Sequence, residues 1–578
     1  MADNKIWVVD NAPSERFPIY TRGNIGEVFP EAVAPLTWTL FGIPGAETGW
    51  RDALERFGAF SQEEFNPNEI EILGVFGGYC YLNVSVYRVI AVRIPGMTPE
   101  MMDQTLFGTS EAPPYRPSPT DESPEHTELI QQTLGWIFTA EDLPELIDDQ
   151  RLVEQLVAGR PDFATLSDAE LWESVKAMAG SFRPLFARHL VITTSATVPV
   201  GVINQVCTEI GQPGTAMRLI AGIGGVDSAA PSWAMWDLSR MVAASPALAS
   251  AFDAGVRGLP ERLRGLGGSD ESAAKFLRAF DDFADQFGSR GPNEWESRSP
   301  TWGTDPELAL AAIDRMRRTP DDAAPQGHWD RYAAEREQLT AEVGAALEGN
   351  PEVQGQFLAA VRAAGIFLAG RERTKTTIIK FVHEVRLRAR ELGRRMVAGG
   401  VFDEELDFGM LTVDEWDRLI AAGQFDKAAI DERKALFARL QALEPPFIID
   451  GKVPPLAEWK ERGANPVAAA RSGEVLDGIA GCPGTYTGVA RVVLHADDPR
   501  QLEPGEILVA PITDPSWTPL FVPAGAVVVD VGAQISHAVI VSRELGIPCV
   551  VSVTDGTRRI PDGATITVDG TAGTVRVH

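Results

Sequence analysis

The chain has 578 residues, 44% of them hydrophobic, and a formal net charge of −29. This length is too great for one hydrophobic core and predicts two or three domains. The negative charge argues against binding to nucleic acid or to an anionic membrane surface. We find no apolar run that approaches a membrane span and no signal peptide, and the four cysteines show no CxxC spacing. These features predict a cytoplasmic protein with buried thiols.

The first four-fifths of the chain divide into stretches of different pattern. Residues 1 to about 100 are broken up by glycine and proline, which predicts a β-rich segment. A proline-rich loop is expected between Asp103 and Thr127. From Leu129 to Glu444, apolar residues recur at three- and four-residue spacing, which predicts a mainly helical region. Pro454, Pro455 and the segment from Gly463 to Gly473 then indicate a linker.

The C-terminal part contains a strand–turn–helix–strand pattern. Val527 to Val529 form a short β-branched run that suits a buried strand, and Asp530 and Gly532 break it. A helix is expected from Ser536 to Gly546, and Cys549 to Val553 read as the next strand.

His537 falls in the first turn of this expected helix. The unpaired N–H groups and partial positive charge of a helix N-terminus favour a neutral, nucleophilic imidazole and would stabilise phosphoryl oxygens on it. Ser536 can cap the helix or donate to the same oxygens. The alternative is a structural histidine, which is the commoner role for a single histidine.

The sequence GAQISHAVIVSRELGIPCVV closely resembles the phosphohistidine motif of the swivelling domain in phosphoenolpyruvate (PEP)-utilising enzymes. The resemblance runs from about Leu476 to the C-terminus, with Gly484, Gly488 and Arg491 at the positions of the family's opening motif. Ile535 and the Cys482-Pro483 pair depart from the usual residues. The resemblance implies an α/β swivelling domain over 476–578 in which His537 carries a phosphoryl group, supported by Ser536 and Gly532.

The first part resembles the acceptor domains of superfamily members that phosphorylate organic hydroxyl groups, such as rifampin phosphotransferase. The motifs that carry this resemblance are NIGEVFPEAVAPLTW, RGPNEWESRSPTW, RERTK and VFDEELD. Gly288-Ser289-Arg290 stands where many relatives have Gly-His-Arg. The expected organisation is multidomain α+β, with an acceptor-binding domain over 1–465, a hinge linker over 466–475 and the swivelling domain over 476–578.

Three cations fall on one face of an expected helix. Arg371 and Lys375 are one turn apart, and Arg386 is close to four turns from Arg371. Together they could hold phosphoryl oxygens at the acceptor end. The alternative is a solvated face on which these cations pair with glutamates, namely Glu372, Glu384 and Glu391.

Aromatic and basic residues in the acceptor motifs are candidates for binding the acceptor molecule. Trp38, Tyr81 and Trp302 could wall an aryl pocket, although aromatics in such segments are usually core. Arg290, in the RGPNEW motif, is predicted to contact the acceptor. A general base for the acceptor hydroxyl is not evident, because neither His189 nor His383 stands out.

The sequence shows no GxxxxGK[ST] loop, and its segments match only acceptor and swivelling parts. The resemblance to two-subunit aryl dikinases therefore implies that ATP and Mg²⁺ bind to a separate ATP-grasp subunit and that this chain holds no metal. The expected reaction passes the β-phosphate of ATP through His537 to a small phenol such as 4-hydroxyacetophenone or acetovanillone, which gives an aryl phosphate, AMP and phosphate. Alternatives are a phosphocarrier or regulatory protein, and a phosphotransferase for phenol or an antibiotic hydroxyl.

Overall fold

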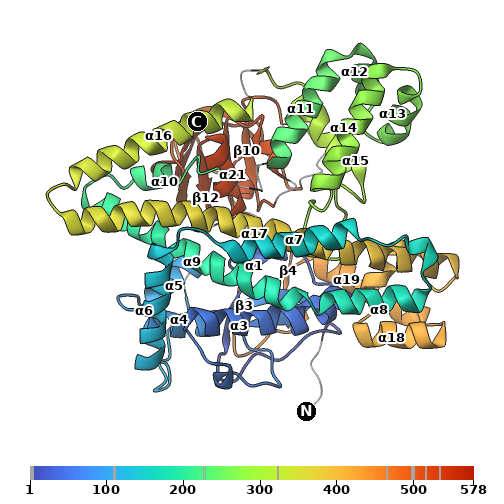
Figure 1. The fold of residues 1–578 in the computed structure, drawn as a ribbon, viewed down its shortest axis with the longest axis horizontal. Coiled ribbons are helices and arrows are strands. Elements are labelled where there is room, and N and C mark those ends of the chain that lie inside the picture. The colour runs from blue at the N-terminus through green and yellow to red at the C-terminus, as the bar shows by residue number, and fades with distance from the viewer. Residues whose placement is uncertain are drawn as a thin grey trace. The chain divides into compact units, whose positions relative to one another are not determined.

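The computed structural model describes residues 6–107, 112–224, 227, 230–321, 324–463, 467–495, 502–514, 517–532 and 536–578. The chain is a multidomain α+β protein (Figure 1). It divides into two compact units, which we describe separately. Unit 1 comprises 1–195, 295–299 and 374–466, and unit 2 comprises 196–294, 300–373 and 467–578. One division falls inside the long helix α17 (Pro351–Ala398), between Arg373 and Thr374.

Unit 1 contains an antiparallel sheet of four short strands in the order β2-β3-β1-β5. The strands are β1 (Ile19–Thr21), β2 (Leu73–Phe76), β3 (Tyr79–Asn83) and β5 (Ile448–Asp450). Asn83 ends β3 and begins the next helix, because its side chain accepts a hydrogen bond from the Val86 amide at 3.0 Å. Its amide group also donates to the carbonyls of Phe17 and Glu71, so this buried residue ties the sheet to both flanking segments.

Helices cover more of the predicted β-rich segment than strands do, so that prediction is wrong outside β1, β2 and β3. The helices are α1 (Ile25–Val28), α2 (Pro35–Thr37), the π-helix η1 (Trp38–Glu47), α3 (Thr48–Phe57) and α4 (Val84–Arg93). The sequence of α4, VSVYRVIAVR, is rich in β-branched residues that favour a strand locally. The Asn83 cap and burial in the core override that preference in α4. In α2, Pro35 occupies the first helical position, where proline is favoured.

The expected proline-rich loop begins with a helix, α5 (Pro99–Phe107). The remaining helices of unit 1 confirm the predicted helical region. They are α6 (Pro124–Thr139), α7 (Pro144–Ala158), α8 (Asp168–Ala179), the first part of α9 (Phe182–Glu209), the second part of α17, α18 (Val413–Ala422) and α19 (Lys427–Gln441). A two-stranded ribbon of β4 (Leu443–Glu444) and β6 (Lys460–Glu461) follows.

Two helical segments, 168–209 and 351–398, are long and apolar enough to cross a membrane by length and composition alone. The expectation that no apolar run approaches a membrane span therefore needs correction. Buried core helices pass the same test, and these segments bury side chains such as Val191, Ile203, Phe367 and Ile379 within the protein. This evidence for a membrane span is weak, and a cytoplasmic location remains a prediction.

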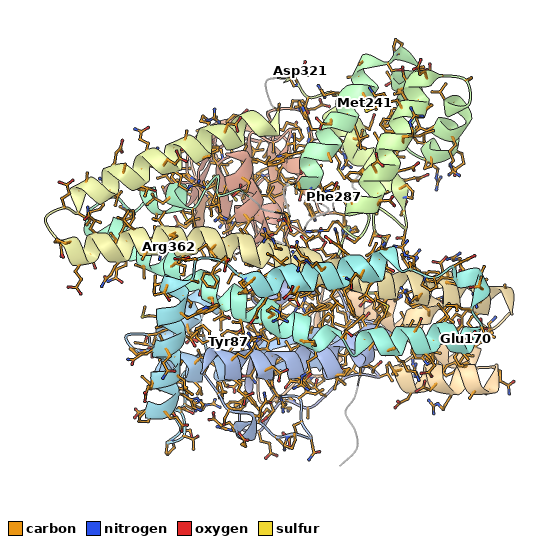
Figure 2. The ribbon with its side chains drawn as sticks, viewed as in Figure 1. Tyr87, Glu170, Met241, Phe287, Asp321 and Arg362 are labelled. Atoms are coloured by element: carbon orange, nitrogen blue, oxygen red, sulfur yellow. The ribbon has the colours of Figure 1, made fainter. Side chains whose placement is uncertain are left out.

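The helical part of unit 2 is built around an apolar core shared by several helices. These are α11 (Ala230–Ala244), α12 (Pro246–Asp253), α13 (Leu259–Gly267), α14 (Glu271–Phe287) and α15 (Pro306–Met316). Phe276, Phe283 and Ile313 lie inside this core, and Met241 and Phe287, labelled in Figure 2, pack against it. Two further helices, α10 (Thr215–Leu219) and α16 (Pro325–Ala346), contact each other.

The C-terminal part of unit 2 is a sheet of eight strands in the order β7-β14-β13-β9-β10-β11-β12-β8. The strands are β7 (Val475–Asp477), β8 (Ile479–Cys482), β9 (Thr485–Val492), β10 (Ile507–Ala510), β11 (Ala526–Val529), β12 (Cys549–Val551), β13 (Thr565–Asp569) and β14 (Thr574–Val577). Strands β9 to β12 pair in parallel, and every residue of β10, β11 and β12 is buried. Such strands need cover on both faces, which explains their unbroken apolar sequences.

The predicted strand–turn–helix–strand pattern is confirmed by β11, α21 (His537–Leu545) and β12, of which α21 and β12 are labelled in Figure 1. Gly546 ends the helix in the left-handed conformation, with φ 67°, which explains why glycine stands there. Two short helices complete this part, α20 (Thr518–Phe521) and α22 (Gly556–Arg559). The departure noted at Ile535 lies outside the described residues.

Part of the predicted hinge over 466–475 packs on the sheet. Ala470 lies in the sheet's apolar core and donates its amide to the Arg559 carbonyl at 2.7 Å, and the Gly473 amide donates to Val577 at 2.8 Å. Residues 464–466 lie outside the described residues. The segment that could act as a hinge therefore precedes Ala470, and the division into acceptor domain, hinge and swivelling domain stays a prediction.

Candidate phosphohistidine site

The candidate site lies at the carboxyl ends of the parallel strands β10 and β11. The chain leaves β11 at Asp530 and returns as α21, whose first residue is His537. The loop that follows β10 brings Thr513, and the start of α20 brings Thr518. Because parallel strands end at the same edge of a sheet, residues from these separate segments meet there.

Threonine hydroxyl groups contact both ring nitrogens of His537. Thr513 Oγ1 lies 3.1 Å from Nδ1, and Thr518 Oγ1 lies 3.2 Å from Nε2. A hydroxyl can donate or accept, so this pair suits a neutral imidazole in either tautomer. The ring of Phe521 packs edge-on against the half-buried imidazole, with 5.9 Å between ring centroids. The two hydroxyl groups and the Phe521 ring thus orient the imidazole, and in its neutral form one ring nitrogen can act as a nucleophile.

Ser536 and Gly532, the two predicted supporting residues, lie close together, and Ser536 directly precedes the histidine. Ser536 is the N-cap residue of α21, but its side chain makes no capping hydrogen bond. Its Oγ is buried and has no hydrogen-bond partner within the described part of the chain. A Cβ at Gly532 would come within 3.1 Å of this Oγ and 3.0 Å of Val551 Cβ, so glycine leaves the hydroxyl room to turn. The hydroxyl can therefore turn towards an oxygen bound at the histidine.

Asp530, at the end of β11, has an unusual protonation equilibrium. Burial raises the pKa of its carboxyl group from 3.8 to about 6, against the lowering effect of hydrogen bonds from Thr557. The Thr557 amide donates to Oδ1 at 2.7 Å, and the Thr557 hydroxyl donates to Oδ2. These bonds hold the end of β11 to the short helix α22.

The three predicted cations lie on α17 but in different surroundings. Arg371, in unit 2, is partly buried and pairs with Glu372 at 2.6 Å. Lys375, in unit 1, is half-buried. Arg386, also in unit 1, is completely buried and donates to the Glu296 carbonyl at 3.0 Å.

The alternative reading of a solvated helix face is therefore wrong for Arg386. Two of the glutamates suggested as partners bind other arginines: Glu384 pairs with Arg160 and Arg388, and Glu391 with Arg394 and Arg395. In the RERTK motif Glu372 and Thr374 are buried and the three cations are half-buried, and its role at the acceptor end stays a prediction.

Both histidines weighed as general bases are buried in unit 1. His383 is surrounded by arginines, and burial, followed by the charges of Arg386, Arg160 and Arg390, lowers its pKa well below the usual value. His189 Nδ1 lies 2.9 Å from Thr374 Oγ1. Its ring packs near Trp295, at 6.1 Å between centroids.

The four predicted acceptor-binding residues are all buried. In unit 1, Trp38 lies on the π-helix and Tyr81 donates its hydroxyl to the Pro446 carbonyl at 2.7 Å. In unit 2, Arg290 Nε lies 2.8 Å from the Glu294 carboxylate, and Trp302 packs in the helical core 5.7 Å from the Phe283 ring. These contacts give Tyr81 and Trp302 structural roles, while contact with an acceptor remains a prediction for all four.

Sequence reasoning missed Thr513, Thr518 and Phe521, although it identified the segment that contains them. Two threonines at short spacing after a buried strand, in a segment that precedes the histidine helix, were the available signal. Within the described ranges, no group of three or more His, Cys, Asp or Glu side chains could hold a metal ion.

Comparisons with known proteins match two separate parts of the chain. A family model described as the rifampicin phosphotransferase fourth domain matches residues 188–372, and one described as the PEP-utilising enzyme mobile domain matches residues 502–573. The second match contains the whole His537 site. The first contains the RGPNEW motif and Arg371.

Three curated relatives illustrate the similarity. The prodigiosin synthesizing transferase PigC of Serratia marcescens is 26% identical over 88% of this chain and 57% of its own length. The rifampicin phosphotransferase of Streptomyces sviceus is 31% identical over 52% of this chain and 34% of its own length. An uncharacterised protein of Mycobacterium tuberculosis is 32% identical over 50% of this chain and 30% of its own length. The chain thus spans between about a third and just over half of these relatives. It contains a PEP-utilising enzyme mobile domain and is related to the rifampicin phosphotransferases.

Proposed function

We propose that this chain is a phosphotransferase in which His537 accepts a phosphoryl group and passes it to the hydroxyl group of a small phenol. The observation that carries the proposal is the imidazole at the start of α21, oriented by Thr513 and Thr518 at its two nitrogens. This arrangement leaves a neutral nitrogen as nucleophile beside the N–H groups of a helix N-terminus. Ser536, whose hydroxyl is buried and unengaged within the described residues, can donate to a phosphoryl oxygen.

In the first step, a separate ATP-grasp subunit binds ATP with Mg²⁺ and presents the β-phosphorus to His537. A nitrogen–phosphorus bond forms as the bond from the β-phosphorus to the α-phosphate oxygen breaks, and AMP leaves. Water attacks the γ-phosphorus, the bond from the γ-phosphorus to the β-phosphate oxygen breaks, and inorganic phosphate is released, which leaves a single phosphoryl group on His537. The protein's part is to position the imidazole and to stabilise the oxygens of the transferred group.

In the second step, the phenol oxygen attacks phosphorus, the nitrogen–phosphorus bond breaks and His537 is regenerated. The phenol proton passes to solvent or to a nearby base. Arg371, Lys375 and Arg386 are proposed to stabilise the group in transfer, and Trp38 and Arg290 to contact the acceptor. 4-Hydroxyacetophenone and acetovanillone are the proposed acceptors.

The test mixes the purified chain with a candidate ATP-grasp protein, ATP labelled at the β-phosphate, Mg²⁺ and a panel of phenols. We expect labelled aryl phosphate together with AMP and phosphate. Labelled His537 that no phenol discharges would instead indicate a phosphocarrier or regulatory protein. Formation of ADP as the only nucleotide product would contradict the proposed reaction.

A further inference from the structure

The C-terminal half of α21 carries two adjacent charges that are almost completely buried. Arg543 and Glu544 are 2% and 3% exposed, and Arg543 Nε lies 4.0 Å from Glu544 Oε1. Other parts of unit 2 place charges around them: Arg371 and Glu372 on α17, and Arg336 on α16. The helix that begins with His537 therefore ends among charges from helices that precede the sheet domain in the sequence.

This buried pair is poorly satisfied. Within the described residues, Nε and Nη1 of Arg543 and Oε1 of Glu544 have no hydrogen-bond partner. Burial lowers the pKa of Arg543 and raises that of Glu544 to about 7, and both shifts oppose the charged forms. Removing charges from water costs free energy that only good geometry and full hydrogen bonding return. The contact is thus less stable than an apolar contact of the same size would be.

Hydrogen bonds join the sheet domain to the helix α16 and to the RGPNEW segment of the same unit. Tyr332 of α16 donates its hydroxyl to the Gly546 carbonyl at 3.0 Å, directly after α21. At the other end of α21, the Asn293 amide donates to the Asp514 carboxylate at 3.1 Å. Asp514 follows Thr513, the residue that contacts His537. One bond therefore lies beside the histidine site and the other at the far end of its helix.

The seam between the two parts is only partly apolar: Val522 of the sheet domain packs against the apolar core of the helices, and polar groups and open space make up other parts of it. Beside Tyr332 lies a cavity of about 950 Å³, bounded on the helical side by Arg218 and Gln338 and on the sheet side by Gly484 and Thr571. Interfaces that stay closed permanently are usually larger, drier and more apolar. A cavity, a strained charge pair and a few hydrogen bonds are the features expected of a contact that opens.

We propose that the sheet domain docks on α16, α17 and the RGPNEW segment through these contacts for transfer to the acceptor, and that Arg543 and Glu544 keep this docking reversible. The proposal rests on the proposed function, since a carrier needs to leave one site to reach another. Tyr332 and Asn293 hold the docked state and Arg543 and Glu544 weaken it. All four are positioning residues and do not touch the reacting atoms.

Two variants change docking in opposite directions. Arg543→Met/Glu544→Met replaces the buried charges by apolar side chains of similar length and strands no other charge: Glu372 keeps Arg371, and Arg336 keeps the carbonyls of Ala221 and Gly222. It should tighten docking. Tyr332→Phe removes only the hydroxyl and should loosen it.

Amide hydrogen exchange at Asn293 measures docking directly in the unphosphorylated full chain, because this amide is bonded only when the domain is docked. We expect exchange at least about five-fold slower in the double variant and about five-fold faster in Tyr332→Phe. The matched control is Arg264→Met/Glu261→Met, an exposed pair on α13, which should leave exchange at Asn293 unchanged. Thermal unfolding of every variant checks that the fold is retained.

A functional readout separates docking from structural damage. Phosphoramidate can phosphorylate His537 without a partner, with ammonia as the leaving group. The double variant should then pass its phosphoryl group to a phenol at the normal rate in a single turnover. Its rate in repeated turnovers should fall several-fold, because release of the docked sheet domain becomes limiting. Exchange that is unchanged or faster in the double variant, or unchanged in Tyr332→Phe, would overturn the docking proposal. If exchange shifts as expected but His537 accepts no phosphoryl group, the proposed function fails instead.

Discussion

The Asn293 amide and the Asp514 carboxylate, 221 residues apart in the sequence, form a hydrogen bond of 3.1 Å. Asn293 adopts a left-handed conformation with φ 47°, which asparagine tolerates better than most residues. The bond links the RGPNEW segment to the loop that orients His537 through Thr513. Two stretches matched by different family models are thus joined at the histidine site.

The threonine contacts should control the reactivity of His537. Thr513→Val and Thr518→Val each remove one hydroxyl with little change in volume. Each lost hydrogen bond is worth about 1 kcal/mol, so we expect phosphorylation by phosphoramidate to slow roughly five- to ten-fold in each variant. The rate of appearance of acid-labile phosphate measures this step. Wild-type rates in both variants would show that the hydroxyl groups do not orient the imidazole.

Asp530 should destabilise the folded protein at neutral pH. Its folded pKa of about 6 lies above its ordinary value of 3.8, so folding disfavours the charged form. The stability that wild type has below pH 3.8 is therefore lost as pH rises from there through 6. Asp530→Asn should raise the free energy of unfolding by about 1–2 kcal/mol at pH 7.5, because the shift exceeds the loss of charge-assisted bonds from Thr557. Denaturant unfolding at pH 7.5 and pH 4 measures the difference, which should disappear at pH 4.

Docking of the sheet domain should weaken as pH rises. Glu544 has a pKa of about 7 when it is buried beside Arg543, and an ordinary carboxyl pKa when it is exposed. The other charged groups that face this pair are Arg336 on α16 and Arg371 and Glu372 on α17. Its protonated form therefore favours the docked state, so the equilibrium constant for docking should fall by up to roughly ten-fold per pH unit between pH 5 and 7. Exchange at Asn293, corrected for the intrinsic pH dependence of exchange, reports this equilibrium. Glu544→Gln should abolish the pH dependence, and a dependence that persists would assign it to another group.

Arg371 and Lys375 should act on transfer to the acceptor and not on loading. Arg371→Ala and Lys375→Ala are expected to leave phosphorylation of His537 nearly intact. Discharge to 4-hydroxyacetophenone should slow roughly a hundred- to a thousand-fold, because positive charge at a transferring phosphoryl group is worth a few kcal/mol of barrier. A single-turnover chase measures the discharge alone. Wild-type discharge in both variants would leave the two residues with a structural role only.

The parts of the fold that the sequence predicts well are those in which local signals agree. For β11, α21 and β12, the apolar runs, the helix start at Ser536 and the C-cap at Gly546 all point to one arrangement, and the structure has it. The segment 84–93 shows the opposite case, since its β-branched residues favour a strand while the Asn83 cap and its burial make it a helix.

The surroundings of His537 and of the cations could not be predicted in the same way. Thr513 and Thr518 reach the imidazole only because β10 and β11 pair in parallel, which is a tertiary relationship. Helical spacing placed Arg386 on a face shared with Arg371, but it could not reveal that Arg386 is completely buried against the Glu296 carbonyl. Spacing gives the face of a helix, and packing decides what covers it.

The central claim is that His537 carries the phosphoryl group to the acceptor, and one labelling experiment tests it most directly. The full chain and His537→Ala are treated with phosphoramidate, the modified residue is located by mass spectrometry, and the isolated protein is chased with 4-hydroxyacetophenone. We predict an acid-labile phosphoryl group on His537 alone, its loss during the chase and an equal amount of aryl phosphate, with neither modification nor product in the variant. Label on His537→Ala, or aryl phosphate formed by it at the wild-type rate, would contradict the account.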